Sequence, residues 1–306
     1  MSLCSLHIFS NQFYRKFIVL LLFLIALNLT LKAQNSTRQQ KLDSLLRLDK
    51  VYLNEDTQKL DLYIKVLNET YNYTNDIALF QSYSDRSIRL AQKLKNGRSL
   101  AESYYYTGFN YQSRGVFDKA EDYYNLSLKK AKESNHLKSS AGTYLNLSAL
   151  YNNLSNYSKA LDANLAATQI FHKLGDQNST AACYVNIASI YASLNQQKTA
   201  IDYLNKALKI FTELGNTPYA MGLTYSNLSR AYLNATNEDL KQLGVTDLER
   251  QNKVLNYVDR SQQVAIQQDI ASLLSANYEI KGKISELFAD KKSALDSYQK
   301  SLAQAK

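Results

Sequence analysis

The sequence predicts an all-α protein, built as a right-handed α-solenoid of about six antiparallel helix pairs. Composition is the first reason: the 306 residues include one proline and nine glycines, while 45% are hydrophobic. So few helix breakers in so apolar a chain favour long helices around a large core. Repetition is the second reason, because a short phrase bounded by tyrosines occurs four times, as YYYTGFNY, YLNLSALY, YVNIASIY and YSNLSRAY.

Residues 1–33 are expected to be a secretory signal peptide. Arg15 and Lys16 precede the apolar run Phe17–Leu31, and the small residue Ala33 stands where a signal peptidase would cut. The alternative is an uncleaved anchor, but this run falls short of the roughly 20 residues that span a bilayer. We therefore expect an exported protein, periplasmic or extracellular. Any membrane contact would come through this segment or through a tether in a longer natural chain.

The exported chain then starts with a lead-in, residues 34–55, that contains a short helix. Loss of residues 1–33 removes three basic residues and lowers the formal net charge from +9 to +6. Cys183 becomes the only cysteine, so an intramolecular disulfide is impossible and stability must come from packing.

The tyrosine-bounded phrases have the spacing of a solenoid. They begin at Tyr104, Tyr144, Tyr184 and Tyr225, which gives a period of about 40 residues, typical of stacked repeats. In YLNLSALY, positions i, i+3, i+4 and i+7 place Tyr144, Leu147, Ser148 and Tyr151 on one helix face. A second helical segment follows, for example Lys198–Phe211. The helix pairs are predicted near residues 56–96, 99–135, 138–175, 178–215, 217–268 and 270–306.

Small residues recur where the two helices of a pair should cross. The first helices carry Gly108, Ser148, Ala188 and Ser229 at equivalent sites, and the second helices carry Ala120, Ala160 and Ala200. Helices that approach closely need a small side chain at the crossing, so a larger residue there should overpack the contact.

This order of large and small residues resembles the tetratricopeptide repeat (TPR). In the copy YYYTGFNYQSRGVFDKAEDYY the matching residues are Tyr104, Gly108, Tyr111, Phe117, Ala120 and Tyr124. The resemblance covers about residues 57–306 and implies a helical superhelix that binds proteins or peptides. Two departures stand out: the period is longer than is usual for this family, and Asn164 replaces an expected aromatic residue.

The fifth pair contains an insertion, Asn237–Glu249. Gly244 is expected to interrupt it, and Thr246 or Asp247 to cap a new helix. The segment is either a lid over a ligand or simple length variation in an uncrowded turn.

The sequence contains no pattern of residues that indicates a catalytic, metal or cofactor site. No metal, cofactor or catalytic motif occurs, His136 and His172 lack partners at ligand spacing, and Cys183 is expected to be a buried, inert thiol. Nucleic acid is not an expected partner, because basic and acidic residues are interspersed and no nucleic-acid-binding module occurs. We therefore expect no enzyme activity within residues 1–306.

The surface formed by the first helices is the candidate site, because solenoids bind extended partners along such a surface. Asn146, Asn186 and Asn227 occupy one equivalent position, where carboxamides either bracket a peptide backbone or are solvated residues kept by duplication. The predicted groove residues are Tyr105, Tyr106, Phe109, Leu145, Asn146, Ala149, Asn152, Val185, Asn186, Ser189, Ala192, Ser226, Asn227 and Arg230.

The last predicted pair leaves Leu287, Ala294, Leu295, Tyr298 and Leu302 on a face with nothing following it, so the natural chain is expected to continue or dock there. A signal peptide, a lead-in and long repeats together resemble the exported sensor region of bacterial signalling receptors. That resemblance implies a membrane helix and a histidine kinase or helix-turn-helix output domain further along. The alternative is a free-standing secreted or periplasmic scaffold or adaptor.

Overall fold

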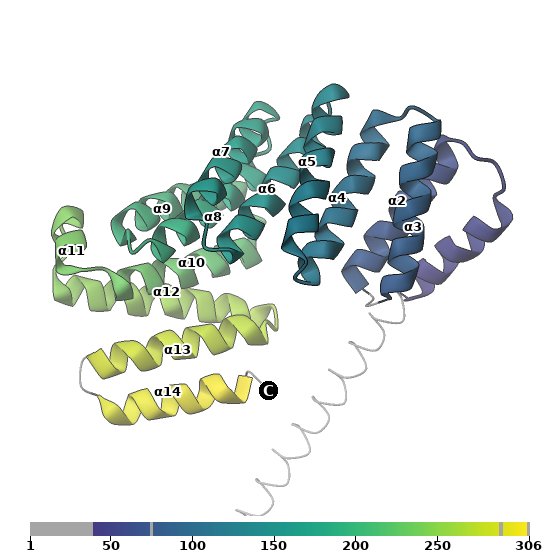
Figure 1. The fold of residues 1–306 in the computed structure, drawn as a ribbon. Helices are drawn as coiled ribbons and strands as arrows, with labels where there is room; N and C mark the ends of the chain where they lie inside the picture. Colours follow the sequence, from purple (N-terminus) through teal and green to yellow (C-terminus); the bar gives the residue numbers. More distant parts are fainter. Residues whose placement is uncertain (1–38, 74–75, 288–289, 305–306) are drawn as a thin grey trace, which may run out of the picture. The chain divides into compact units, whose positions relative to one another are not determined.

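The computed structural model describes residues 39–73, 76–287 and 290–304, and every regular element in these ranges is an α-helix (Figure 1). This confirms the all-α solenoid class. The predicted signal peptide, residues 1–33, lies outside the described residues. Within the described ranges, no helix combines the length and the apolar character that a bilayer crossing requires.

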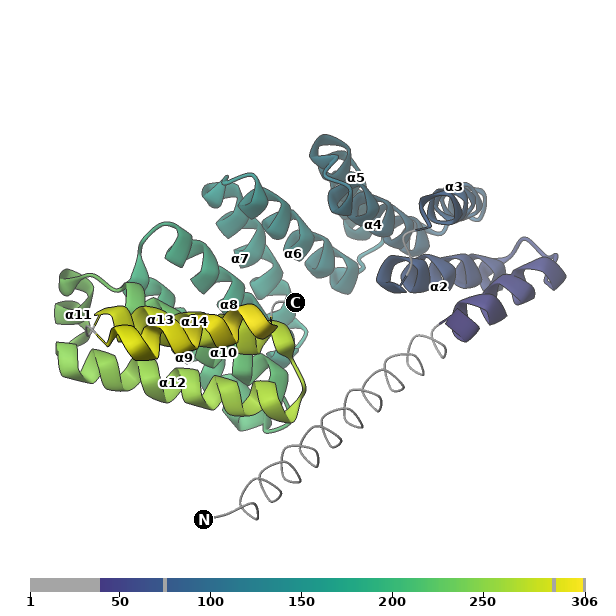
Figure 2. The same cartoon turned by 90° about the horizontal axis from the view of Figure 1, so that it is seen from below.

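The chain divides into two compact units at Val116 and Phe117. The first unit contains a helix over residues 39–51, α2 (Thr57–Tyr73), α3 (Ile77–Lys93) and α4 (Gly97–Ser113). The second unit contains the helices α5 (Phe117–Glu133), α6 (Leu137–Asn153), α7 (Tyr157–Lys173), α8 (Gln177–Ser193), α9 (Gln197–Leu214), α10 (Pro218–Asn234), α11 (Asn237–Leu243), α12 (Asp247–Gln267), α13 (Ala271–Leu287) and α14 (Lys291–Gln304). In the second unit each helix from α5 to α10 packs on the next, followed by the pairs α10–α12, α12–α13 and α13–α14 (Figure 2).

The turns set this regular layout. A residue with positive φ ends most helices, at Lys95, Gly115, Asn135, Ser155, Gly175, Asn195 and Gly215, and a left-handed residue is the usual helix stop. Several of the following helices begin with a side-chain cap; Asn156, for example, accepts a hydrogen bond from the Lys159 backbone N–H at 3.2 Å. The capped turn reverses the chain over a few residues, so consecutive helices become antiparallel neighbours.

Small residues hold the helix pairs together at their crossings, as the sequence predicts. Ala160 and Ala200 are fully buried. Ser148 adds a hydrogen bond, because its Oγ donates to the carbonyl oxygen of Ala160 at 2.9 Å. Asn164, the residue in place of an aromatic, is also fully buried and donates to Ser148 Oγ at 3.1 Å. The departure from the repeat therefore extends a buried polar contact between α6 and α7.

In two helix pairs, the tyrosines at the two ends of the repeated phrase both contact the ring of one tyrosine from the second helix of the pair. Tyr203 lies 5.8 Å from the Tyr184 ring and 5.7 Å from the Tyr191 ring, measured between centroids. In the next pair Tyr257 lies between Tyr225 and Tyr232, at 6.1 and 6.0 Å. Aromatic pairs at these separations stabilise the contact beyond simple burial, which is why both ends of the phrase recur.

The insertion folds into the short helix α11 rather than an extended loop. Leu240 is buried, and Asp239 Oδ1 accepts a hydrogen bond from the backbone N–H of Lys198, the second residue of α9, at 3.4 Å. Gly244 ends the helix with a φ of 64°. Thr246, not Asp247, caps α12, and with Glu249 it forms a capping box. After the insertion Val254 takes the place of Ala160 and Ala200, because Ser229 Oγ donates to its carbonyl at 2.8 Å.

The last helix pair buries one of the residues expected to lie on an open face. Ala294 is buried, whereas Leu287, Leu295 and Leu302 are each more than half exposed. Tyr298 donates a hydrogen bond to Glu286 at 2.9 Å. Ala294 stands in the repeat where Ala160 and Ala200 stand in earlier pairs, so its burial fits the small-residue position of the second helix.

The helix over residues 39–51 is an integral part of the first unit. Its residue Asp49 is buried and pairs with Lys59 of α2 at 2.7 Å and with Arg86 of α3 at 2.8 Å. Tyr83 donates a hydrogen bond to the same carboxylate at 2.6 Å. Three helices are thus joined by one acidic side chain.

Candidate functional site

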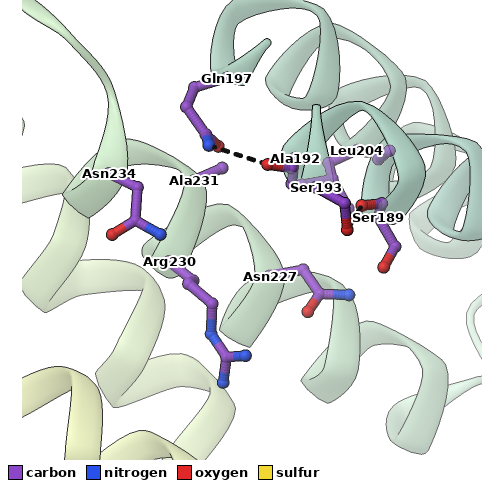
Figure 3. Close-up of a pocket in the computed structure, with 10 residues that line it drawn as sticks. Ser189, Ala192, Ser193, Gln197, Leu204, Asn227, Arg230, Ala231 and Asn234 are labelled. Atoms are coloured by element: carbon purple, nitrogen blue, oxygen red, sulfur yellow. Dashed lines mark hydrogen bonds between the residues drawn. The ribbon is translucent and has the colours of Figure 1, made fainter. Parts of the chain in front are cut away.

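A polar pocket lies between α8, α9 and α10 in the second unit (Figure 3). Its volume is about 240 Å³. Two first helices, α8 and α10, supply most of its walls, and α9 closes one end. The lining residues are Ala188, Ser189, Ala192, Ser193, Gln197, Leu204, Asn227, Arg230, Ala231 and Asn234.

One face of α10 carries the polar side chains of this pocket. Asn227, Arg230 and Asn234 follow one another at i, i+3 and i+7, so they share a helix face. Within the described part of the chain, none of the three side chains makes a hydrogen bond or an ion pair. Arg230 and Asn234 are exposed, and Asn227 is half-buried. The face is therefore ready to bind a partner without first breaking contacts inside the protein.

Gln197 of α9 forms the end wall and is only 3% exposed. Its Nε2 donates to the carbonyl oxygen of Ala192 at 3.3 Å, but its buried Oε1 finds no partner among the described residues. A buried polar atom without a partner is costly and needs an explanation. The position offers a sequence signal, because the equivalent residues one and two repeats earlier are Tyr157 and Phe117. A carboxamide therefore replaces an aromatic ring where the pocket forms.

The predicted groove residues fall into several environments. Ser189, Ala192, Asn227 and Arg230 come together in the pocket. Tyr105, Tyr106 and Phe109 belong to the first unit, where each is half-buried and Tyr106 donates to Asn68 Oδ1 at 3.1 Å.

The remaining predicted residues are spread along α6, α8 and α10 of the second unit. Leu145 and Val185 pack against hydrophobic clusters, and Ser226 is buried. Ala149 and Asn186 are exposed, while Asn146 and Asn152 are half-buried. Each of these two asparagines has one buried amide atom without a partner in the described residues. The three asparagines at one equivalent position thus differ in exposure, and only Asn227 lines the pocket.

Six residues that line the pocket were not among the predicted groove residues: Ala188, Ser193, Gln197, Leu204, Ala231 and Asn234. Gln197 and Asn234 are the two carboxamides among them. Gln197 belongs to a second helix, and Asn234 is the last residue of α10. The sequence prediction considered only the middle of the first helices, and the pocket forms where one helix pair meets the next. Gln197 and Asn234 therefore lay outside it.

The reactive side chains occupy unreactive environments. Burial raises the pKa of the Cys183 thiol to about 11, and a hydrogen bond with Thr168 offsets this only in part. His136 Nδ1 lies 2.5 Å from Ser139 Oγ, within its own turn. In the ranges that the structure describes, no group of three or more His, Cys, Asp and Glu side chains is placed to hold a metal ion.

Stacked antiparallel helix pairs with small residues at their crossings define a TPR-like α-solenoid. Residues 139–213, which span most of α6 to α9, match the model of the tetratricopeptide repeat family. No curated protein sequence matches the chain.

Solved structures share the fold at low sequence identity. A signal-transduction ATPase of the STAND class from Pyrococcus horikoshii, with a tetratricopeptide repeat sensor, is 14% identical with a TM-score of 0.69. The match covers 89% of this chain but only 40% of that protein. The apo form of RapI is 15% identical with a TM-score of 0.60, over 90% of this chain and 95% of its own. A Rap protein complexed with Competence and Sporulation Factor is 14% identical with a TM-score of 0.55, over 89% and 77%.

Proposed function

We propose that this protein is an interaction module that binds an extended peptide, or an extended segment of a protein, in the pocket between α8 and α10. The observation that carries the proposal is the face of α10 on which Asn227, Arg230 and Asn234 make no hydrogen bond or ion pair within the described chain. Carboxamides offer a donor and an acceptor together, which suits the alternating groups of a peptide backbone. Repeat solenoids commonly use such surfaces for extended partners.

A sensing role is the finer part of the proposal. The protein acts as the ligand-binding region of an exported bacterial signalling receptor whose output is a histidine kinase or a helix-turn-helix domain. Two comparisons support a sensing role by analogy, since the STAND protein has a tetratricopeptide repeat sensor and the Rap protein is complexed with Competence and Sporulation Factor. The predicted signal peptide supports export. A free-standing exported adaptor would use the same pocket without an output domain.

Peptide binding is tested with a displayed library of random nonapeptides, panned against the purified chain. We expect peptides that bind the wild type but lose at least tenfold in affinity for Ala192→Trp, because the indole fills the pocket. Asn205→Trp places the same ring on an exposed position of α9 outside the pocket, so its affinity should be unchanged. Far-UV circular dichroism confirms that both variants keep their helices. A library without binders, or an unaffected Ala192→Trp variant, would contradict the proposal.

Export is tested separately. A C-terminally tagged chain expressed in a Gram-negative host should appear in the periplasmic fraction without residues 1–33, as shown by mass spectrometry of the recovered protein. A full-length product in the cytosol would refute export. The gene sequence after Lys306 distinguishes the two roles, because a stop codon there favours the free-standing adaptor.

A further inference from the structure

A basic pocket lies in the first unit, between α3, α2 and the segment that precedes α2. Its volume is about 410 Å³, which falls within the roughly 300–1,000 Å³ of pockets that take a small ligand. Three of its residues are cations at positions i, i+3 and i+7 of α3, so they share one helix face. The lining residues are Glu55, Tyr63, Arg86, Arg89, Leu90 and Lys93.

The half-buried cation of this pocket, Arg86, keeps donors and charge to spare. It contacts Asp49 at 2.8 and 3.0 Å and donates to the Tyr63 hydroxyl at 2.9 Å, but a guanidinium carries five N–H donors. Asp49 also pairs with Lys59, so its one negative charge faces two cations. Tyr63 is buried, and its own hydroxyl proton has no acceptor among the described residues. This wall therefore offers N–H and O–H donors together with an excess positive charge.

The other two cations, Arg89 and Lys93, are exposed and lie one turn apart on α3. Arg89 makes no hydrogen bond or ion pair within the described chain, and Asp85, one turn earlier, accepts from Gln81 at 3.0 Å instead. Lys93 pairs with Glu55, but both side chains are more than half exposed, and such surface pairs contribute little to stability. An incoming anion can therefore displace Glu55 from Lys93 at small cost.

We propose that this pocket binds a phosphate monoester, held by Arg89, Lys93 and the unused donors of Arg86 and Tyr63. At neutral pH this group carries about −1.5 to −2 charge and three strong acceptor oxygens, which match several separate donors and an excess of positive charge. A carboxylate has a single charge that one arginine can satisfy, so it would leave cations of the pocket uncompensated. The ester is either a soluble small molecule or a lipid headgroup, since both present the same phosphate. The site belongs to the first unit and does not depend on the proposed peptide binding, whose pocket belongs to the second.

Binding is tested by isothermal titration calorimetry of the purified chain at low ionic strength, with glycerol phosphate as the soluble probe. We expect saturable binding, and at least about tenfold weaker binding of acetate, because acetate forms fewer charge-assisted hydrogen bonds. Arg89→Gln should lower the affinity for glycerol phosphate at least about tenfold, because its charge-assisted bonds are lost. Glu55→Gln should raise that affinity about threefold or more, because Lys93 no longer has a competing partner.

The matched control is Arg47→Gln. Arg47 is an exposed arginine of the first unit, in the helix over residues 39–51, and it also lacks an ion pair or hydrogen bond in the described chain, but it does not line the pocket. The substitution removes the same charge, and the affinity should stay within about twofold of the wild type because solvent screens a distant exposed charge. Arg89 and Glu55 are exposed as well, so the variants should fold, and circular dichroism checks that they do.

Vesicles distinguish the two sources of the phosphate. Phosphatidylcholine vesicles doped with phosphatidic acid present the monoester in a membrane, and cosedimentation is measured as the excess over pure phosphatidylcholine. An excess that Arg89→Gln abolishes assigns the lipid headgroup, whereas binding of glycerol phosphate without an excess assigns a soluble ester. Binding of neither probe overturns the proposal. Equal losses in Arg89→Gln and Arg47→Gln also overturn it, because the attraction would then come from the net charge of the chain.

Discussion

Asp49 is a carboxylate almost fully enclosed by groups that donate to it. Burial alone would raise its pKa, but hydrogen bonds from Arg86, Lys59 and Tyr83 outweigh that effect and hold the pKa below its ordinary value of 3.8. The Arg86 guanidinium also stacks on the rings of Tyr63 and Tyr83, at 4.4 and 4.7 Å from their centroids. Asp49 therefore supplies the negative charge that balances two cations, the buried Lys59 and the half-buried Arg86.

Asp49→Ala should destabilise the first unit by about 3 kcal/mol. This is the lower end for a broken buried pair, because the Arg86 side chain remains 32% exposed and can rehydrate. Denaturant unfolding, with hydrogen exchange of α2 and α3 as the local probe, measures the effect. The control is Glu55→Ala, which removes an exposed partner of Lys93 and should change little. Equal effects of the two substitutions would contradict a special role for Asp49.

Acid should weaken the same cluster. A carboxylate whose folded pKa is depressed stabilises the protein above its unfolded pKa of about 3.9, and this stability is lost as the pH falls through the folded value. The free energy of unfolding should therefore drop below about pH 4. Asp49→Asn should reduce that slope, while Glu55 and Asp56, whose pKa values are also lowered, keep part of it. An unchanged slope in Asp49→Asn would show that Asp49 does not contribute.

At the scale of the element, local sequence predicts most of what is observed. Ala160, Ala200 and Ser148 lie at the crossings where the repeat pattern places them, because small residues are needed wherever two helices touch. Thr246 caps α12 for an equally local reason, since its partner Glu249 lies within the first turn of the same helix. The fold of the insertion was not predicted, because packing of Leu240 in α11 depends on a surface supplied by distant residues.

Ala200→Leu should overpack the α8–α9 crossing and cost about 1–3 kcal/mol in the stability of the second unit. Thermal unfolding followed by circular dichroism measures this cost. A leucine at exposed Asn205 of the same helix serves as the control and should leave the midpoint almost unchanged. If the unfolding temperature of Ala200→Leu equals that of the wild type, the α8–α9 crossing accommodates a leucine without strain and the prediction is wrong.

At the scale of the whole molecule, the chain forms two compact units. Cys183 lies in the second unit, so the reactivity of its thiol can be used to follow the unfolding of that unit. Cys183 is fully buried in α8, and its thiol has a pKa of about 11. The thiolate is the nucleophile that attacks a disulfide reagent, so both burial and the raised pKa suppress reaction in the folded state.

In a Cys4→Ser background, Cys183 should react with a disulfide reagent at pH 8 only when the second unit unfolds. The labelling rate should rise with denaturant at the midpoint found by circular dichroism. A Ser158→Cys, Cys183→Ala variant places the thiol on an exposed position and should label at once. Fast labelling of Cys183 in native buffer would mean that α8 opens locally.

The sequence by itself determined the helix pairs, their small-residue crossings and the predicted TPR resemblance, because these follow from spacing within a single repeat and its copies. It also identified Ser189, Asn227 and Arg230 as residues of one surface. Only the tertiary structure decided that Gln197 and Asn234 complete a pocket with them, and that Asp49 joins three helices. The physical reason is that periodicity records which face of a helix is buried. Which side chains then meet depends on how successive helices stack.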